Sequence, residues 1–395
     1  MDPHEPAPVR NRRHLDSFMQ TFDVVVIGLG GIGSAAAVTL ARRGVSVLGI
    51  DRFSPAHSRG SSHGQTRLFR TAYFEHSDYV PLLRRSAELW RERESETQRQ
   101  LFARTGVLLA GPAAGNVLTG TITAANDHDV AVETQSATEA MVRWPMLRFP
   151  VEWSTIFEPD AGCLFVEACV QAQLQAAAAA GAELRHGTVV REIACRKAGV
   201  EVVTDTERVV AGRLVFCPGP WANELLPVPG VPLTVLRKSL FWYRPADATA
   251  YAPTNMPCFG ADTPGGFFYA TPAFDMRGVK LAEHSGGLPL SGPGEINRAI
   301  DPVEQSAVEA WATASIPLLG HERSGHTACF YTMSPDRHAV VGHHPNHPQV
   351  SIATGFSGHG FKFAPVIGEV LADLSSEGST SLPVGFLSPS RFSSN

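Results

Sequence analysis

Near its amino-terminal end the chain reads DVVVIGLGGIGSAAAVTL over residues 23–40. Residues 22–27 form a short, nearly continuous apolar run rich in valine, which is typical of a parallel strand covered on both faces. Glycines follow in the spacing G-x-G-x-x-G at residues 28–33. Glycine there lets backbone N–H groups approach a ligand closely where a helix begins. The stretch therefore predicts a nucleotide-binding turn.

A second buried strand is expected at residues 45–50, after an alanine-rich helical stretch at residues 34–43, and Asp51 closes it. An acidic residue at this point of a βαβ unit is placed to bind a ribose hydroxyl group. Asp51 favours FAD or NAD over NADP, because NADP carries a phosphate on that ribose. The alternative is a tight βα turn that binds no ligand.

A similar glycine-rich junction lies near the other end of the chain. GFSGHG at residues 355–360 follows a strand-like run at residues 350–354 and precedes a helical stretch at residues 365–374. Two such junctions, with most of the protein between them, predict one long ligand that both ends of the chain hold.

Bulk composition excludes several classes of protein. The 395 residues exceed one ordinary core, so we expect two domains. With 44% apolar and 18% charged residues, the chain fits a soluble globular protein. The net charge is -5, so the chain lacks the excess of basic residues that nucleic-acid-binding proteins use, and we expect no nucleic-acid partner. We expect no membrane span, because no long apolar run occurs.

The amino-terminal residues and the cysteines bear on location. Residues 1–20 are polar and lack the apolar core of a signal peptide, so we predict a flexible extension. The six cysteines form no C-x-x-C pair. Scattered single thiols favour a reducing, cytoplasmic location.

Between the two junctions the patterns are mixed. Helical patterns occupy residues 79–105 and 170–181, and alternation typical of a large antiparallel sheet dominates residues 231–284. Residues 288–293 look like a Gly/Pro loop. The simplest architecture is a mixed α/β protein, in which a discontinuous nucleotide domain carries an inserted sheet domain.

Three further segments carry reactive side chains, each with a plain structural alternative. GSSHGQTRLFR at residues 60–70 could be a solvated polar loop, Cys329 a buried inert thiol, and Lys280 a solvated surface lysine. Taken together, however, they resemble the monomeric sarcosine oxidase and N-methyltryptophan oxidase family of covalent-flavin amine oxidases. The most specific motifs are SHGQTR at 62–67, GVK at 278–280, ACFY at 328–331 and SGHGFKF at 357–363.

The resemblance implies roles for residues around a flavin. The cysteine matching Cys329 carries FAD through a thioether, and the lysine matching Lys280 promotes the reaction with oxygen. A fixed cation in a dry site would stabilise the negative charge that develops on oxygen. His63 and Arg67 match residues beside the flavin ring, and Arg67 would favour anionic reduced flavin and help the thioether to form.

The resemblance also implies a substrate site. Arg70 and Lys362 match the pair that grips the substrate carboxylate, a strong and orienting contact. Tyr269 and His284 match residues that line the substrate cavity.

The implied fold is a Rossmann-type FAD-binding domain of the glutathione reductase-like kind with an inserted antiparallel-sheet substrate domain. The expected bounds are 21–105, 158–230 and 326–392 for the FAD domain, and 106–157 and 231–325 for the substrate domain. The expected cofactor-binding residues are Gly28, Gly30, Gly31, Ile32, Gly33, Asp51, Arg52, Ser61, His63, Thr66, Arg67, Val190, Gly219, Trp221, Cys329, Gly355, Gly358, His359, Gly360, Phe361 and Lys362.

Some positions depart from the family pattern. Gln65 stands where the family commonly has Asp, and Ser62 where it commonly has a second His, so flavin redox tuning could differ. Four histidines fall within residues 338–347, but no cysteine or spaced carboxylate completes a metal ligand set, and we expect no metal.

The expected function is a monomeric FAD-dependent oxidase of N-methyl or cyclic secondary α-amino acids. Hydride would leave the C–H next to nitrogen, giving an imine, and O2 would be reduced to H2O2. Three alternatives remain open: a flavin dehydrogenase that passes electrons to a protein or quinone, a biosynthetic ring-desaturating oxidase, and a nucleotide-binding module without turnover.

Overall fold

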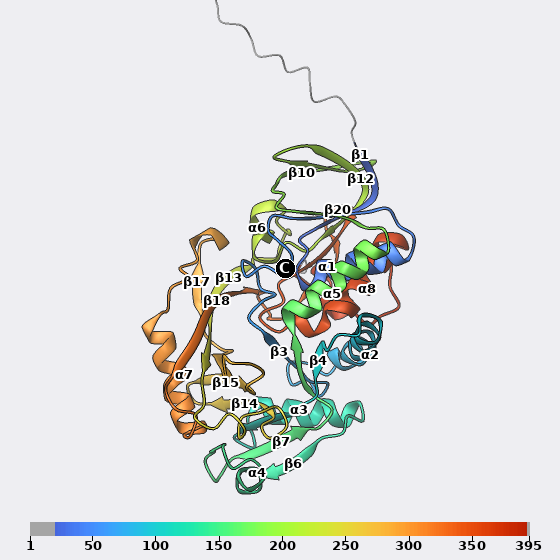
Figure 1. The fold of residues 1–395 in the computed structure, drawn as a ribbon. Coiled ribbons are helices and arrows are strands. Elements are labelled where there is room, and N and C mark those ends of the chain that lie inside the picture. The colour runs from blue at the N-terminus through green and yellow to red at the C-terminus, as the bar shows by residue number, and fades with distance from the viewer. Residues whose placement is uncertain (1–19, 393–395) are drawn as a thin grey trace, which may run out of the picture.

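The computed structural model describes residues 20–392, and its upper part in Figure 1 is built on an eight-stranded sheet. Strands run in the order β10-β11-β12-β1-β2-β9, with β20 beside β12 and β19 beside β20. The strands that meet β1 and β12 in parallel are continuous apolar runs, as strands buried on both faces require. The bounds are β1 (Gln20–Ile27), β2 (Val47–Asp51), β9 (Glu183–His186), β10 (Val190–Arg196), β11 (Gly199–Thr204), β12 (Arg208–Phe216), β19 (Val340–His344) and β20 (His347–Thr354).

One face of this sheet is covered by α1 (Gly31–Arg42), which lies against both α5 (Val166–Ala179) and α8 (Ala364–Ser376) (Figure 1). The fit is tight because the facing residues are small. A Cβ at Gly368 of α8 would lie 2.6 Å from the backbone carbon of Ala35 in α1. The two glycine-rich junctions thus lead into helices that touch each other.

The lower part of Figure 1 contains a nine-stranded sheet in the order β17-β13-β16-β15-β14-β5-β7-β6, with β18 beside β13. Side chains alternate between its faces. Leu240 and Trp242 of β13 share one face with Cys329 of β18, whereas Phe241 packs on the other face with Trp311 of α7. The strands are β5 (Val107–Gly111), β6 (Glu133–Ser136), β7 (Ser154–Glu158), β13 (Thr234–Tyr243), β14 (Cys258–Thr263), β15 (Gly266–Thr271), β16 (Val279–Glu283), β17 (Leu288–Leu290) and β18 (Arg323–Met333).

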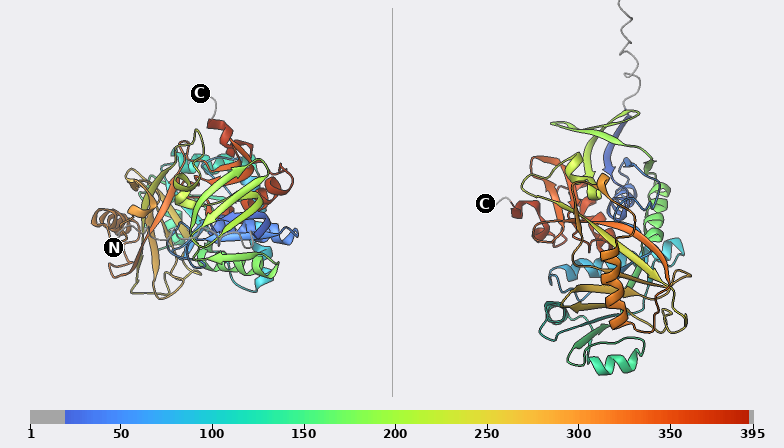
Figure 2. Two further views of the ribbon diagram at one scale, coloured as in Figure 1. Left: turned by 90° about the horizontal axis from the view of Figure 1, so that it is seen from above. Right: turned by 90° about the vertical axis from the view of Figure 1, so that its left-hand side faces the viewer.

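Helices cover this second sheet at its outer side and its far end. The views in Figure 2 place α7 (Pro302–Ser315), in orange, along the outer side of the sheet. The two helices at the far end of the sheet are α3 (Asn116–Asp127) and α4 (Ala137–Arg143). A small sheet of β3 (Thr66–Phe69), β8 (Gly162–Phe165) and β4 (Phe102–Ala103) lies between the two large sheets, and α2 (Tyr79–Thr97) follows β3 (Figure 1).

The mixed α/β fold class predicted from the sequence is confirmed, but two local predictions are wrong and one helix was not predicted. The helix expected over residues 79–105 ends at Thr97, because Gln98 adopts a left-handed conformation with φ 52° and residues 102–103 join a strand. The expected loop at residues 288–293 begins with β17, which pairs with β13. The sequence analysis also assigned no helix to α7. The predicted domain bounds stay a prediction, and the extension predicted for residues 1–20 lies almost wholly outside the described residues.

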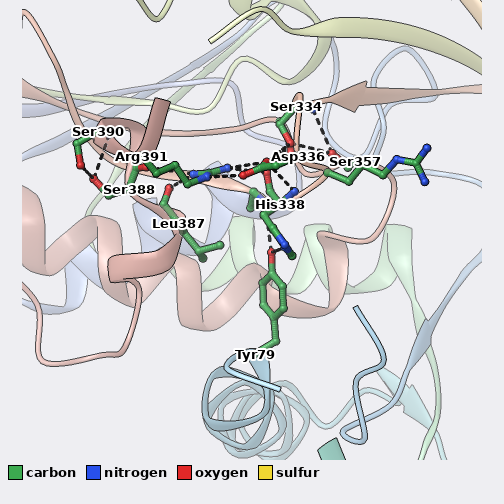
Figure 3. Close-up of polar contacts among 12 residues, drawn as sticks. Tyr79, Ser334, Asp336, His338, Ser357, Leu387, Ser388, Ser390 and Arg391 are labelled. Carbon is green, nitrogen blue, oxygen red and sulfur yellow. Dashed lines mark hydrogen bonds and ion pairs between the residues drawn. The ribbon is translucent and has the colours of Figure 1, made fainter. Parts of the chain in front are cut away.

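The second glycine-rich junction is tied to the carboxyl-terminal segment (Figure 3). Arg391 forms an ion pair with Asp336, whose other oxygen accepts from the backbone N–H of His338. The hydroxyl of Ser357, inside the junction, accepts from the N–H of Ser334 at 3.1 Å. His338 also contacts the Tyr79 hydroxyl through its Nδ1 at 3.3 Å.

Across residues 20–392, no helix combines the length and the apolar character that crossing a membrane requires. The same residues bring together no group of three side chains able to hold a metal ion.

Candidate cofactor and substrate site

A cavity of about 460 Å³ opens at the carboxyl ends of β1, β2, β12 and β20. Ligands bind at this edge of a parallel sheet because strand ends and helix starts converge there. Both glycine-rich junctions line it. The expected cofactor residues in its wall are Gly28, Gly30, Gly31, Ile32, Asp51, Arg52, Ser61, Arg67, Val190, Gly219, Trp221, Gly355, Gly358, Gly360 and Phe361.

Glycine is required at the first junction by close contacts. Gly28 has φ 86°, and a Cβ at Gly33 would lie 1.8 Å from the carbonyl oxygen of Gly28. A Cβ at Gly31 would lie 2.8 Å from the ring of Phe361, which comes from the second junction. At the start of α1 the Gly31 N–H donates to the Ser62 hydroxyl at 3.0 Å, and the N-cap residue Gly30 has no side chain that could cap the other N–H groups. Those N–H groups of the first turn can bind an anionic ligand such as a pyrophosphate.

Asp51 is held at the end of β2 by the turns around it. One carboxylate oxygen accepts from the Leu29 N–H at 2.8 Å, and the other accepts from the Phe53 N–H at 2.9 Å. His57 lies 3.3 Å from the second oxygen. Beside this carboxylate, the guanidinium carbon of Arg52 lies 5.2 Å from the Trp221 ring. Such an arrangement offers an acceptor for a ribose hydroxyl and an aromatic surface for a base.

Cys329 on β18 is 1% exposed and lies behind the wall of this cavity, which includes its neighbours Arg67 and Phe330. The Arg67 guanidinium lies 3.4 Å from its sulfur and also donates to the Ser61 carbonyl at 2.9 Å. Burial raises the pKa of the Cys329 thiol, but the charge and hydrogen bond of His63 and the charge of Arg67 outweigh burial and lower the pKa to about 6. The site therefore favours a thiolate, which is the nucleophilic form.

These features fit FAD. Within the described residues, the buried Nε2 of His63 lacks a hydrogen-bond partner, and an unsatisfied buried nitrogen is costly unless a ligand pairs with it. The glycine cradle would hold the pyrophosphate and Asp51 the ribose, while the Cys329 sulfur lies beside Arg67 behind the cavity wall.

Lys280 on β16 is fully buried, and its ammonium donates to the carbonyl oxygens of Gly64 at 2.8 Å and Thr66 at 2.7 Å. Burial, followed by the charge of Arg67, lowers its pKa well below the ordinary value. The solvated alternative for this lysine is therefore wrong. Burying a protonated lysine costs free energy because the charge loses its hydration, and negative charge developing nearby would favour the protonated form.

A second cavity, of about 60 Å³, adjoins the first and shares Arg67, Tyr331, Gly358 and Phe361 with it. We call it the small cavity. The remaining residues of its wall are Leu68, Arg70, Phe74, Glu75, Phe267, Tyr269, His284, His359 and Lys362.

Two cations and one carboxylate meet in the small cavity. Arg70 forms an ion pair with Glu75 at 2.7 Å, and the ammonium of Lys362 donates to the Tyr73 hydroxyl at 3.1 Å. Burial opposes ionisation of Glu75, but Arg70, His359 and Lys362 lower its pKa to about 2. Burial, then Arg70, lowers the pKa of Lys362 to about 7, while Glu75 acts in the opposite direction. A carboxylate ligand in the small cavity would thus contact the permanent cation Arg70 and the titrating amine of Lys362, and it would compete with the carboxylate of Glu75.

His284 and Tyr269 form a neutral part of the wall of the small cavity. Burial lowers the pKa of His284 to about 3 and raises the pKa of Tyr269 to about 12. His284 Nδ1 lies 3.1 Å from the Tyr331 hydroxyl. This wall suits the uncharged part of a ligand.

The structure thus brings most of the predicted residues together, with a few shifts of position. His359 and Lys362, expected at the cofactor, line the small cavity and not the large one, whereas Gly33, His63, Thr66 and Cys329 lie behind the wall of the large cavity. Four residues of the small cavity were not predicted from the sequence: Glu75, Phe74, Phe267 and Tyr331. Only Tyr331 had a signal, its place in the ACFY motif.

Comparison with known proteins agrees with this geometry. Residues 23–374 match the family model described as FAD dependent oxidoreductase. The chain is 39% identical to monomeric sarcosine oxidase from Streptomyces avermitilis, over 94% of this chain and 98% of that protein. It is 32% identical to N-methyl-L-tryptophan oxidase from Yersinia pestis, over 94% and 99% of the two chains.

A solved structure is similar throughout. The open form of NikD, described as an unusual amino acid oxidase essential for nikkomycin biosynthesis, matches with a TM-score of 0.83 and 26% identity, over 94% of this chain and 98% of NikD. The glycine cradle, the site beside Cys329 and these matches support one assignment: the chain belongs to the family of FAD-dependent oxidoreductases that includes monomeric sarcosine oxidase and N-methyl-L-tryptophan oxidase.

Proposed function

We propose that the protein oxidises secondary α-amino acids, N-methylated or cyclic, and passes the electrons to O2. The observation that carries the proposal is the small cavity, where Arg70 and Lys362 converge beside the large cavity that fits FAD. When bound, FAD supplies the two-electron acceptor for oxidation of the C–H next to nitrogen. The names of the relatives support an N-substituted amino acid as the donor.

Binding of the substrate carboxylate rests on Arg70 and Lys362. Arg70 offers a planar fork and Lys362 a point charge, a combination that orients a carboxylate. The substrate carboxylate would replace Glu75 as the partner of Arg70, since both are anions competing for one guanidinium. With its carboxylate fixed here, the substrate would place its amine against the neutral wall of Tyr269 and His284.

The substrate amine must be neutral to lose hydride, so activity should rise with pH as the amine deprotonates. The neutral wall supports this requirement, because an ammonium ion would gain no counter-charge from His284 or Tyr269. The imine product would then leave and hydrolyse.

Covalent attachment of FAD to Cys329 is part of the proposal. The low pKa of the thiol supports it, because the thiolate is the attacking form. Arg67 and His63 would hold that thiolate.

Lys280 is proposed to assist the reduction of O2 to H2O2. Burial and then the charge of Arg67 lower the pKa of Lys280, and negative charge developing on oxygen nearby would stabilise its protonated form. We further propose that the protein is a cytoplasmic monomer with the two-domain division predicted from the sequence.

An oxygen-uptake screen over sarcosine, N-methyl amino acids, proline and pipecolate tests the function. Oxygen consumption with matching H2O2 supports an oxidase. If a substrate reduces the flavin but oxygen is consumed only after an artificial electron acceptor is added, the protein is instead a dehydrogenase. If FAD binds but no substrate reduces it, the protein is a nucleotide-binding module.

A further inference from the structure

Two phenylalanines form part of the outer wall of the small cavity. Phe74 comes from the loop between β3 and α2, and Phe267 from the start of β15. Their ring centroids lie 5.8 Å apart with the planes inclined at 52°. Both side chains line the small cavity and both are only half-buried, so the rings stand between the cavity and solvent.

The position of Phe74 is fixed from two sides. The guanidinium carbon of Arg70 lies 4.1 Å from the centroid of its ring. The backbone of Phe74 rests on Gly120 in α3, where a Cβ would lie 2.6 Å from the Phe74 carbonyl oxygen. Glycine inside a helix costs about 1 kcal/mol relative to alanine. At Gly120 it permits the loop to lie directly on the helix, which holds the ring against the cavity.

The volume that remains is small. The small cavity measures about 60 Å³. One ordered water needs roughly 10–15 Å³ on this scale, so the space holds the equivalent of roughly four to six waters. A short N-methyl amino acid has about that many non-hydrogen atoms. A bulky aromatic side chain exceeds this space, and the Phe74–Phe267 pair closes one direction in which the cavity could extend.

We propose that Phe74, with Phe267 behind it, is the specificity-determining residue that restricts this site to secondary amino acids with small side chains. The inference rests on the proposed function and goes further, because it names the substrate size and the side chain that sets it. Removing the Phe74 ring opens the cavity toward solvent and admits a larger side chain, while Arg70 and Lys362 remain to bind the carboxylate.

The test compares sarcosine with N-methyl-L-tryptophan as substrates of the holoenzyme. Phe74→Ala should raise the ratio of kcat/KM for N-methyl-L-tryptophan over sarcosine roughly 10- to 100-fold, the range expected when a steric block is removed. Phe267→Ala should change the ratio in the same direction, and it provides a second variant if Phe74→Ala fails to fold. Phe274→Ala is the matched control, because this ring packs in the same cluster against Phe165 at 5.0 Å without lining the cavity.

Calorimetry with acetate and indole-3-acetate gives a readout that needs no turnover. Wild type should bind acetate and exclude indole-3-acetate, and Phe74→Ala should bind both. An unchanged ratio in both folded variants, or the same increase in Phe274→Ala, overturns the inference and leaves the proposed function standing. If no secondary amino acid reduces the wild-type flavin, the proposed function fails, and calorimetry still shows whether Phe74 limits ligand size.

Discussion

The thiol of Cys329 should titrate far below an ordinary cysteine. At pH 7 a thiol with a pKa of about 6 is roughly 90% thiolate, whereas at the ordinary value of 9.0 it is roughly 1% thiolate. A shift of this size corresponds to about 4 kcal/mol of preferential stabilisation of the thiolate. Burial acts in the opposite direction, and the thiolate is stabilised by the charge and hydrogen bond of His63, then by the charge of Arg67 and a hydrogen bond with the backbone of Phe330.

Removing either Arg67 or His63 should raise the pKa of the Cys329 thiol again. In Arg67→Gln the sulfur loses a neighbour that now lies 3.4 Å away, while burial remains. The pKa of Cys329 should then rise toward or above its ordinary value, and attachment of FAD at neutral pH should slow in proportion to the lost thiolate, by up to roughly 100-fold. His63→Asn should act in the same direction.

The assay uses flavin-free protein from riboflavin-starved cells. Alkylation by iodoacetamide across a pH series, mapped by mass spectrometry, should give half-maximal labelling of Cys329 near pH 6. Cys217 is the internal control, because burial raises its pKa. Labelling of Cys329 that rises only near the ordinary thiol pKa, or an identical profile in Arg67→Gln, would refute the reasoning.

Three further predictions concern the charged groups. Lys280→Met should slow reoxidation of the reduced flavin far more than anaerobic reduction, measured by stopped flow; equal slowing of both steps would argue against a role with oxygen. Arg70→Ala should weaken binding of a nonreacting carboxylate roughly 10- to 100-fold by calorimetry, and unchanged affinity would exclude it as the anchor. Lys362 is protonated below its pKa of about 7, so carboxylate affinity should fall as pH rises through that value, and Lys362→Met should remove the fall. Persistence of the fall in the variant would assign it to another group.

The residues at the cofactor end of the site were predicted from the sequence better than those at the substrate end. Gly28, Gly33 and Asp51 belong to one local βαβ unit, whose spacing alone brings them together. Cys329 and Lys280 were found through motifs, and the structure adds the physical reason, since both lie on one face of the second sheet toward Arg67.

The rest depends on tertiary contacts that no local pattern records. In the sequence Glu75 and Phe74 look like ordinary loop residues, and they line the cavity in a loop that rests on Gly120 of α3 and contacts Arg70. In the sequence Phe267 looks like one of several alternating strand residues. Its position at the cavity follows from the pairing of β15 with β16. The helix α7 was not predicted because its apolar residues form a core only together with residues of the second sheet, which a local pattern does not show.

The decisive measurement is oxygen uptake with sarcosine. We expect the purified holoenzyme to consume oxygen without an added acceptor, with H2O2 formed in equal amount and catalase returning half of the oxygen. Anaerobic sarcosine should bleach the flavin. Failure of every N-methyl and cyclic amino acid to bleach it, or bleaching that air does not reverse, would contradict the account.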